Sequence, residues 1–257
     1  MNEYFLLFIT FFVFVHTFFI ISLIIKRNDI ADIAWGMGFI VLSWTAYYIF
    51  GNEQLPAFFA NSLITIWGAR LSFHIYIRNR GKKEDYRYLE WRKQWGKWFY
   101  LRSYGQVFLL QGFLLCLIVF PVILFNTLES VDFGIFFFLG CLLWLLGFFF
   151  EVVGDRQLKQ FLDNPKNKGK IMQIGLWRYT RHPNYFGEVT MWWGVFVMTL
   201  TFYGNLFTII SPLTITFLIL FVSGIPLLEK RYEGNPEFEA YKKKTSIFFP
   251  LPPKRIK

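Results

Sequence analysis

Cysteine and histidine are scarce in this sequence, which contains two cysteines and three histidines among its 257 residues. Cys116 and Cys141 both lie within long apolar runs, so the sequence predicts no disulfide framework and no thiolate metal site. His16, His74 and His182 are far apart in the sequence. We therefore predict no metal centre.

The glycine fingerprints of soluble nucleotide-binding domains are also absent. No G-x-G-x-x-G follows a strand-like run, and no P-loop occurs. No basic stripe interleaved with exposed aromatic residues marks a soluble module, so the sequence predicts no nucleic-acid partner. A nucleotide, if the chain binds one, must be held by another kind of scaffold.

Apolar residues are abundant: 55% of the chain is hydrophobic, and the mean hydropathy is +0.39. A bilayer crossing requires about 20 apolar residues. On that length we predict seven spans, at residues 4–25, 30–50, 57–77, 103–125, 131–152, 183–203 and 206–228. The predicted fold is an all-α integral membrane protein with a single domain over residues 1–257. The first span lacks a basic leader and a small-residue cleavage site, so we expect it to remain in the mature protein.

The distribution of lysine and arginine tests the predicted number of spans independently, because the connections that stay in the cytoplasm are the basic ones. Of the 27 basic residues, 26 fall on alternate connections: 26–27, 78–102, 156–181 and 230–257. The intervening connections "GNEQLP", "NTLES" and "YGN" carry none. The pattern predicts an N-terminus outside, a C-terminus in the cytoplasm, and attraction of the basic face to anionic membrane lipids.

The three long basic segments predict a cytoplasmic cap of loops and short helices. They exceed the length of a compact connection, and "YRYLEWRKQWGKWFYLR" is too aromatic to stay solvated. Asn235 as N-cap and Pro236 at the first helical position predict a short helix in the last segment.

Polar side chains within membrane spans are costly and are functional candidates by default. They are few here: Asp32, Arg70, His74, Gln111, Glu151 and Glu188. Trp67, Arg70 and His74 form one stripe of a helix. Asp32 is the natural acid for Arg70, either in a purely structural ion pair or in a site.

The stretch "RYTRHPNYFGEV", residues 178–189, enters the sixth predicted span. Pro183 suits a first helical turn, whose free N–H groups, flanked by Arg178 and Arg181, predict an anion site. Asn184 and Glu188 are four residues apart and share one helix face. Alternatively, Arg181 and His182 are interfacial side chains that reach toward water.

Glu151 and Asp155 are likewise four residues apart, at the cytoplasmic end of the fifth span, where two carboxylates oppose the helix dipole. Asp155 is either a ligand contact or one partner of a solvated pair with Lys159. Lys166, Lys168 and Lys170, around Gly169, would present mobile ammonium groups to a phosphate. Alternatively, these lysines only mark a cytoplasmic connection of a membrane protein and bind no phosphate.

The stretch "GLWRYTRHPNYFGE" resembles the steroid 5-alpha-reductase family, and in particular a bacterial branch of it. Further motifs follow in order along nearly the whole chain: "NDIADIAWG", "WGARLSFHI", "LLQG", "EVVGDRQLKQF", "NKGK", "SGIPLLE" and "YKKKTSIFFPLPP". The resemblance implies a seven-helix reductase of the bacterial inner membrane. It would bind NADPH and reduce a carbon–carbon double bond conjugated to a carbonyl in a steroid-like or other lipid substrate.

The resemblance also implies roles for individual residues. Asp155 and Lys170 match contacts to the nucleotide half of the cofactor. The remaining cofactor candidates cluster in one motif: Arg178, Tyr179, Arg181, His182, Asn184, Tyr185 and Glu188. Asp32 and Arg70 are the candidate catalytic residues.

The family uses a Glu on the second helix and a Tyr near the third to bind the carbonyl oxygen. Asp32 lies near the position of that Glu, while Trp67 takes the expected place of the Tyr, which puts a steroid substrate in doubt. The same R-H-P-N-Y signature also fits an S-adenosylmethionine-dependent methyltransferase of a membrane-bound substrate. S-adenosylmethionine has no phosphate group for the lysine loop (Lys166, Lys168 and Lys170) to bind, which disfavours the methyltransferase. A lipid transporter is a third hypothesis. It is disfavoured because the polar residues gather toward one face of the membrane instead of forming a path across it.

Overall fold

The computed structural model of the protein describes residues 2–51, 54–128, 133–201 and 205–254. Over this part the chain is helical, with one isolated bridge, between Thr180 and Ser246, and no strand. The all-α prediction is confirmed. The chain divides into two compact units, residues 1–133 (unit 1) and 134–257 (unit 2). The single domain over residues 1–257 stays a prediction.

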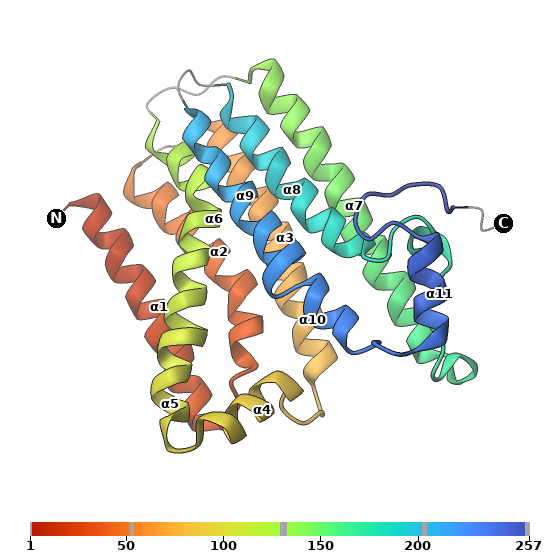
Figure 1. The fold of residues 1–257 in the computed structure, drawn as a ribbon. Coiled ribbons are helices and arrows are strands. Elements are labelled where there is room, and N and C mark those ends of the chain that lie inside the picture. The colour runs from red at the N-terminus through yellow and green to blue at the C-terminus, as the bar shows by residue number, and fades with distance from the viewer. Residues whose placement is uncertain (1, 52–53, 129–132, 202–204, 255–257) are drawn as a thin grey trace. The chain divides into compact units, whose positions relative to one another are not determined.

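The helices of both units are drawn in Figure 1. Unit 1 contains α1 Glu3–Ile25, α2 Ile30–Ile49, α3 Leu55–Asn79, α4 Tyr86–Trp95, η1 Gly96–Trp98, α5 Phe99–Arg102, η2 Ser103–Leu109 and α6 Leu110–Thr127. Unit 2 contains α7 Ile135–Asp163, η3 Pro165–Asn167, η4 Gly175–Arg178, α8 Pro183–Thr199, η5 Asn205–Ile209, α9 Ile210–Phe217, η6 Leu218–Val222, α10 Ile225–Lys230 and α11 Pro236–Lys244.

Five helical segments in the described part of the chain are long and apolar enough to cross a membrane, as expected of a membrane protein. They are Glu3–Ile25, Ile30–Ile49, Tyr86–Thr127, Ile135–Asp163 and Leu206–Lys230. The predicted spans 57–77 and 183–203 coincide with α3 and α8, which are not among these five. The count of seven, the orientation and the cytoplasmic cap therefore stay predictions. Residues 131–132 and 202–203 of two predicted spans lie outside the described residues, as do parts of the three non-basic connections and the end of the basic tail.

In unit 1, α2 packs against α1, α3 and α6. The contact with α3 is close because glycines face each other: a Cβ on Gly36 would lie 2.4 Å from the Gly68 carbonyl oxygen. Ser72 of α3 donates a 2.8 Å hydrogen bond to the Ile33 carbonyl of α2. This packing fixes the first turn of α2, where Asp32 lies.

The short helix α4 lies across the ends of the long helices of unit 1, as the yellow segment of Figure 1 shows. Asp85 caps it by accepting a hydrogen bond from the Arg87 N–H. Because α4 is transverse, it brings side chains from the predicted loop 78–102 to the first turn of α2.

In unit 2, α7 and α8 pack along most of their length, and Figure 1 shows them side by side. Glycines again allow the close approach: a Cβ on Gly187 would lie 2.4 Å from the Gly147 carbonyl oxygen. Small residues are the usual means of close helix packing in a membrane. Pro183 is the first residue of α8 and Asn235 caps α11, as predicted.

The last predicted span, 206–228, is helical but interrupted. A π-helical turn, η6, ends at Val222, and α10 starts anew after Gly224. Pro226 lies in the first turn of α10, where its missing N–H costs no helical hydrogen bond. This break places Glu229 on a short separate helix.

Candidate functional site

In unit 1 the polar site centres on Asp32, in the first turn of α2. Its carboxylate accepts a 2.8 Å hydrogen bond from the Tyr88 hydroxyl and a 2.6 Å hydrogen bond from Arg87 Nη2. Tyr88 is 1% exposed. Arg87 also donates from Nε to Asp85, at 2.9 Å. Burial raises the pKa of Asp85, but the hydrogen bonds and charge of Arg87 outweigh it and lower that pKa overall.

A second set of contacts holds the loop before α4 against the turn that joins α1 to α2. The Asn28 N–H donates to Glu84 at 2.6 Å, and Arg92 is paired with the same carboxylate at 3.2 Å. The Asn28 amide donates to Ser103 at 2.7 Å. These bonds fix the position of α4, and with it that of Tyr88.

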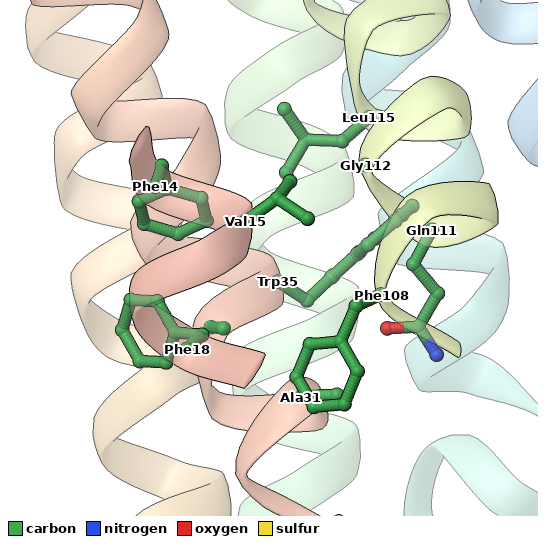
Figure 2. A pocket seen from close by; sticks show the side chains of 10 residues that line it. Phe14, Val15, Phe18, Ala31, Trp35, Phe108, Gln111, Gly112 and Leu115 are labelled. Atoms are coloured by element: carbon green, nitrogen blue, oxygen red, sulfur yellow. The ribbon is translucent and has the colours of Figure 1, made fainter. Parts of the chain in front are cut away.

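A small cavity of about 30 Å³ lies between α1, α2 and α6. Its lining is apolar apart from Gln111 and the indole N–H of Trp35: Phe14, Val15, Phe18, Ala31, Ala34, Trp35, Phe108, Gln111, Gly112 and Leu115. In Figure 2, Gln111 stands on the α6 side and Phe14 and Phe18 on the α1 side. Tyr88 packs in the same hydrophobic cluster as Ala31 and Phe108. The Asp32–Tyr88 pair therefore adjoins an apolar cavity.

Asp32, the acid predicted to pair with Arg70, is thus hydrogen-bonded to Arg87 and Tyr88 of α4. Arg70 lies on α3, and its catalytic role stays a prediction. Trp67 is 1% exposed, and its ring packs edge-on against Phe39 at 5.1 Å. The expectation that Trp67 stands where the family has its tyrosine stays a prediction, while the phenol that contacts Asp32 comes from Tyr88.

All nine predicted cofactor residues belong to unit 2. Asn184, in the first turn of α8, donates from its amide nitrogen to Asp155 of α7 at 3.0 Å. The Asn184 amide oxygen is buried and accepts no hydrogen bond. Tyr185 stacks on His182 with a ring-centroid distance of 5.8 Å. Glu188 follows Asn184 on the same face of α8, as its helical spacing predicts.

Arg181 is 7% exposed and is surrounded by internal partners. Its guanidinium donates to Glu229 at 2.8 Å and to the Thr245 carbonyl at 2.8 Å. His182 Nε2 lies 3.0 Å from the same Glu229 carboxylate. Neither side chain reaches toward water, so the interfacial alternative is wrong for both. Burial lowers the pKa of His182 and outweighs the opposing effect of Glu229.

The segment after α11 runs along residues 179–181. The Arg181 N–H donates to the Ser246 carbonyl at 2.9 Å, and the Leu251 N–H donates to the Tyr179 carbonyl at 3.0 Å. The Tyr241 hydroxyl donates to the Trp177 carbonyl, and burial raises the pKa of this phenol. The side chains of Arg178 and Tyr179 remain exposed, Tyr179 at 43%.

Lys166, Lys168 and Lys170 are all exposed on the loop after α7. Gly169 between them adopts φ +81°, which favours glycine. A cavity of about 260 Å³ adjoins this loop, lined by Gln157, Gln160, Phe161, Asn167, Met172, Ile174 and Gly175. Lys159 pairs with Asp163, and the alternative of a solvated pair between Asp155 and Lys159 stays a prediction.

Sequence reasoning missed Tyr88, Arg87 and Glu229. Tyr88 and Arg87 lie in a segment that the sequence predicts as part of the cytoplasmic cap, and nothing in the sequence indicates which of its aromatic residues faces Asp32. Glu229 was visible as the one acid of the "SGIPLLE" motif, next to the basic tail.

The chain matches, over residues 18–245, the family described as "Protein of unknown function (DUF1295)", which is a steroid 5-alpha-reductase-like family. It is 26% identical over 212 residues to "Uncharacterized protein C594.04c" of Schizosaccharomyces pombe, covering 73% of this chain and 61% of that protein. It is 30% identical over 116 residues to "3-oxo-5-alpha-steroid 4-dehydrogenase 1" of Bos taurus, covering 45% of this chain and 42% of that protein. The chain thus spans less than two thirds of the length of either relative. No solved structure matches this chain.

Proposed function

This chain belongs to the DUF1295 family, and on that premise we propose that it is a membrane-embedded, NADPH-dependent reductase. Its substrate would be a lipid in which a carbon–carbon double bond is conjugated to a carbonyl. The similarity to a steroid dehydrogenase supports an oxidoreductase. The observation that carries the more specific proposal is the Tyr88 hydroxyl, held on Asp32 beside an apolar cavity.

Reduction of an enone places negative charge on the carbonyl oxygen as the β-carbon is reduced. A preorganised hydrogen-bond donor at that oxygen lowers the barrier. The phenol of Tyr88 can turn its hydrogen from Asp32 to a carbonyl oxygen without moving its ring. Arg87 keeps the charge of Asp32 compensated while that hydrogen is withdrawn. Asp32 thus positions Tyr88, and Tyr88 is the group expected to contact the substrate.

Unit 2 offers a set of groups that fits a phosphorylated dinucleotide. The buried Asn184 oxygen lacks a donor, and three exposed lysines surround a glycine with positive φ. Lys170, Arg178, Tyr179, Asn184, Tyr185 and Glu188 are the residues we assign to it, with Asp155 orienting Asn184. Arg181 and His182 hold the loop through Glu229 instead of contacting phosphate. When bound, the cofactor supplies the hydride.

The substrate is expected to be lipid-like because the lining of the unit 1 cavity is apolar. A cavity of about 30 Å³ holds roughly one water molecule. A lipid therefore requires the side chains around it, such as Phe18 and Phe108, to move. Membrane lipids surrounding the chain complete the set of expected partners.

The experiment is a thermal-shift titration of the full-length, detergent-purified protein with NADPH, NADH and S-adenosylmethionine. A ligand at 100 times its Kd stabilises the folded state by about 2.7 kcal/mol. We expect a shift with NADPH that Lys170→Ala and Asn184→Ala reduce, followed by oxidation of NADPH in the presence of a lipophilic enone. A shift with S-adenosylmethionine and none with NADPH would replace this proposal with the methyltransferase alternative.

A further inference from the structure

The segment of residues 86–102, which contains α4, η1 and α5, has two different faces. On the inner face, the buried Tyr88 donates its hydrogen bond to Asp32. The outer face exposes three large apolar side chains: Trp98 at 55%, Tyr100 at 50% and Leu101 at 64%. A contiguous group of exposed apolar side chains marks a contact with a membrane or with another molecule.

Basic side chains accompany these apolar groups. Three of them are exposed: Lys93, Lys97 and Arg102. Arg87 and Arg92, the other basic residues of the segment, form ion pairs with acids of unit 1. Glu90 is the one acidic residue in the sequence between positions 86 and 102. The outer face therefore carries a net positive charge.

Aromatic rings hold two of these cations. Lys97 Nζ lies 5.7 Å from the centre of the Trp98 ring, and Arg102 Cζ lies 6.0 Å from the centre of the Trp95 ring. Trp95 in turn stacks on Trp91, with 5.2 Å between the ring centres. A cation–π contact leaves the N–H groups of the cation free to donate to an anion. The cations and the rings thus form one surface.

The helical run that follows places this surface at a membrane boundary. The run is continuous from Phe99 to Thr127 and belongs to a segment that is long and apolar enough to cross a membrane. At about 1.5 Å per residue it extends about 43 Å. The hydrocarbon core of a bilayer is about 30 Å thick, and the bilayer with its headgroups about 40–45 Å. The first turn of a run of this length, which contains Tyr100, Leu101 and Arg102, therefore lies among the headgroups.

We propose that the outer face of residues 93–102 binds the headgroups of anionic phospholipids. Trp98 and Tyr100 lie at the interface, as amphipathic aromatic side chains do in membrane proteins. Lys93, Lys97 and Arg102 contact the lipid phosphates. A soluble protein or a nucleic acid is a poorer partner, because Leu101 and the two rings lie at the level of the headgroups. The sequence predicts only a diffuse attraction of all basic connections to anionic lipids.

Lipid binding at this surface also stabilises the polar site of unit 1. The same short segment binds lipid on its outer face and presents Tyr88 and Arg87 to Asp32 on its inner face. A ligand that binds only the folded arrangement stabilises that arrangement. Anionic lipid should therefore raise the stability of the protein more than a neutral lipid does.

The test uses the full-length protein in vesicles of phosphatidylglycerol and phosphatidylcholine with identical acyl chains. Bromine on the acyl chains of one of the two lipids quenches the fluorescence of tryptophans that it contacts. The chain has ten tryptophans, so the signal of Trp98 is the difference between wild type and Trp98→Phe. We expect Trp98 to prefer phosphatidylglycerol over phosphatidylcholine by a factor of about five or more, which is the contribution of one basic side chain near an anionic surface.

A triple variant that combines Lys93→Gln, Lys97→Gln and Arg102→Gln removes the charges and keeps the rings. We expect it to lose the lipid preference at Trp98. It should also lose the higher Tm of wild type in phosphatidylglycerol than in phosphatidylcholine, a difference of about 2–4 °C. The matched control combines three changes on an exposed loop without aromatic residues: Lys166→Gln, Lys168→Gln and Lys170→Gln. It removes the same charge and should behave as the wild type does in both measurements.

Equal quenching of Trp98 by the two brominated lipids would overturn the inference. The absence of quenching by either lipid would do so too, because it would place this surface against water or another protein. An unchanged lipid preference in the triple variant would also overturn it, since the three cations would then not be the groups that bind the headgroups. None of these measurements requires NADPH or a substrate, so their failure leaves the proposed function untouched.

Discussion

The Tyr88 hydroxyl donates a 2.8 Å hydrogen bond to the Asp32 carboxylate, across 56 positions of sequence. Asp32 is fixed in the first turn of α2, and Tyr88 is carried to it by the transverse helix α4. The pair adjoins an apolar cavity, where a single hydrogen bond is worth more than in water. It is therefore the most direct point at which to test the proposed chemistry.

Tyr88→Phe should lower kcat for enone reduction by roughly 10²–10³-fold, because one hydrogen bond to the developing oxyanion is lost. The affinity for NADPH should not change, since the lost hydrogen bond is directed at the substrate carbonyl and Tyr88 is not among the assigned cofactor residues. Steady-state kinetics and a binding titration measure the two effects. Tyr104→Phe is the matched control, because it deletes a phenol that bonds to His16 instead. Equal kcat in Tyr88→Phe and wild type would remove Tyr88 from the mechanism.

Arg87→Met should destabilise the protein by roughly 2 kcal/mol, because it leaves the Asp32 carboxylate without its charge partner. Asp32→Asn in the same background should recover part of that loss, since no uncompensated charge then remains. Thermal unfolding of the two single variants and the double variant gives the interaction energy as a double-mutant cycle. Strictly additive losses would show that the 2.6 Å ion pair contributes nothing.

Gly187→Ala should lower stability by roughly 1–3 kcal/mol. Its new methyl group would lie 2.4 Å from the Gly147 carbonyl oxygen, so α7 and α8 would have to separate. Gly105→Ala is the control, because a Cβ there meets no atom within 4 Å. The Tm values of the two variants in detergent test the prediction. Similar Tm values for the two variants would mean that α7 and α8 can separate without a loss of stability.

His182 should make the protein less stable as the pH falls below neutrality. Burial lowers its pKa in the folded state, against opposing contributions from Glu229, while the unfolded ring keeps a pKa of about 6.5. Between these two pKa values the unfolded state binds more protons, so the free energy of unfolding decreases with decreasing pH. Glu229 and Arg181 are the charged groups that face the ring.

The measurement is the Tm of wild type and His182→Gln at pH 7.5 and 5.5. Glutamine does not titrate, so the variant should lose less stability over this interval than the wild type. A loss as large in the variant would assign the acid sensitivity to other groups.

The sequence by itself determined the helical class, the apolar segments and the two starting points Pro183 and Asn235, because these follow from local hydrophobicity and from hydrogen bonds within one turn. Its motifs also predict that Asp155, Asn184 and the loop with Lys166, Lys168 and Lys170 form one cofactor region, and of these the structure joins Asn184 to Asp155. Only the tertiary structure decided the partners: Tyr88 and Arg87 for Asp32, and Glu229 for Arg181 and His182. These contacts join residues 47–56 positions apart. They depend on how helices pack across a unit, and no local pattern of charge or hydrophobicity specifies that.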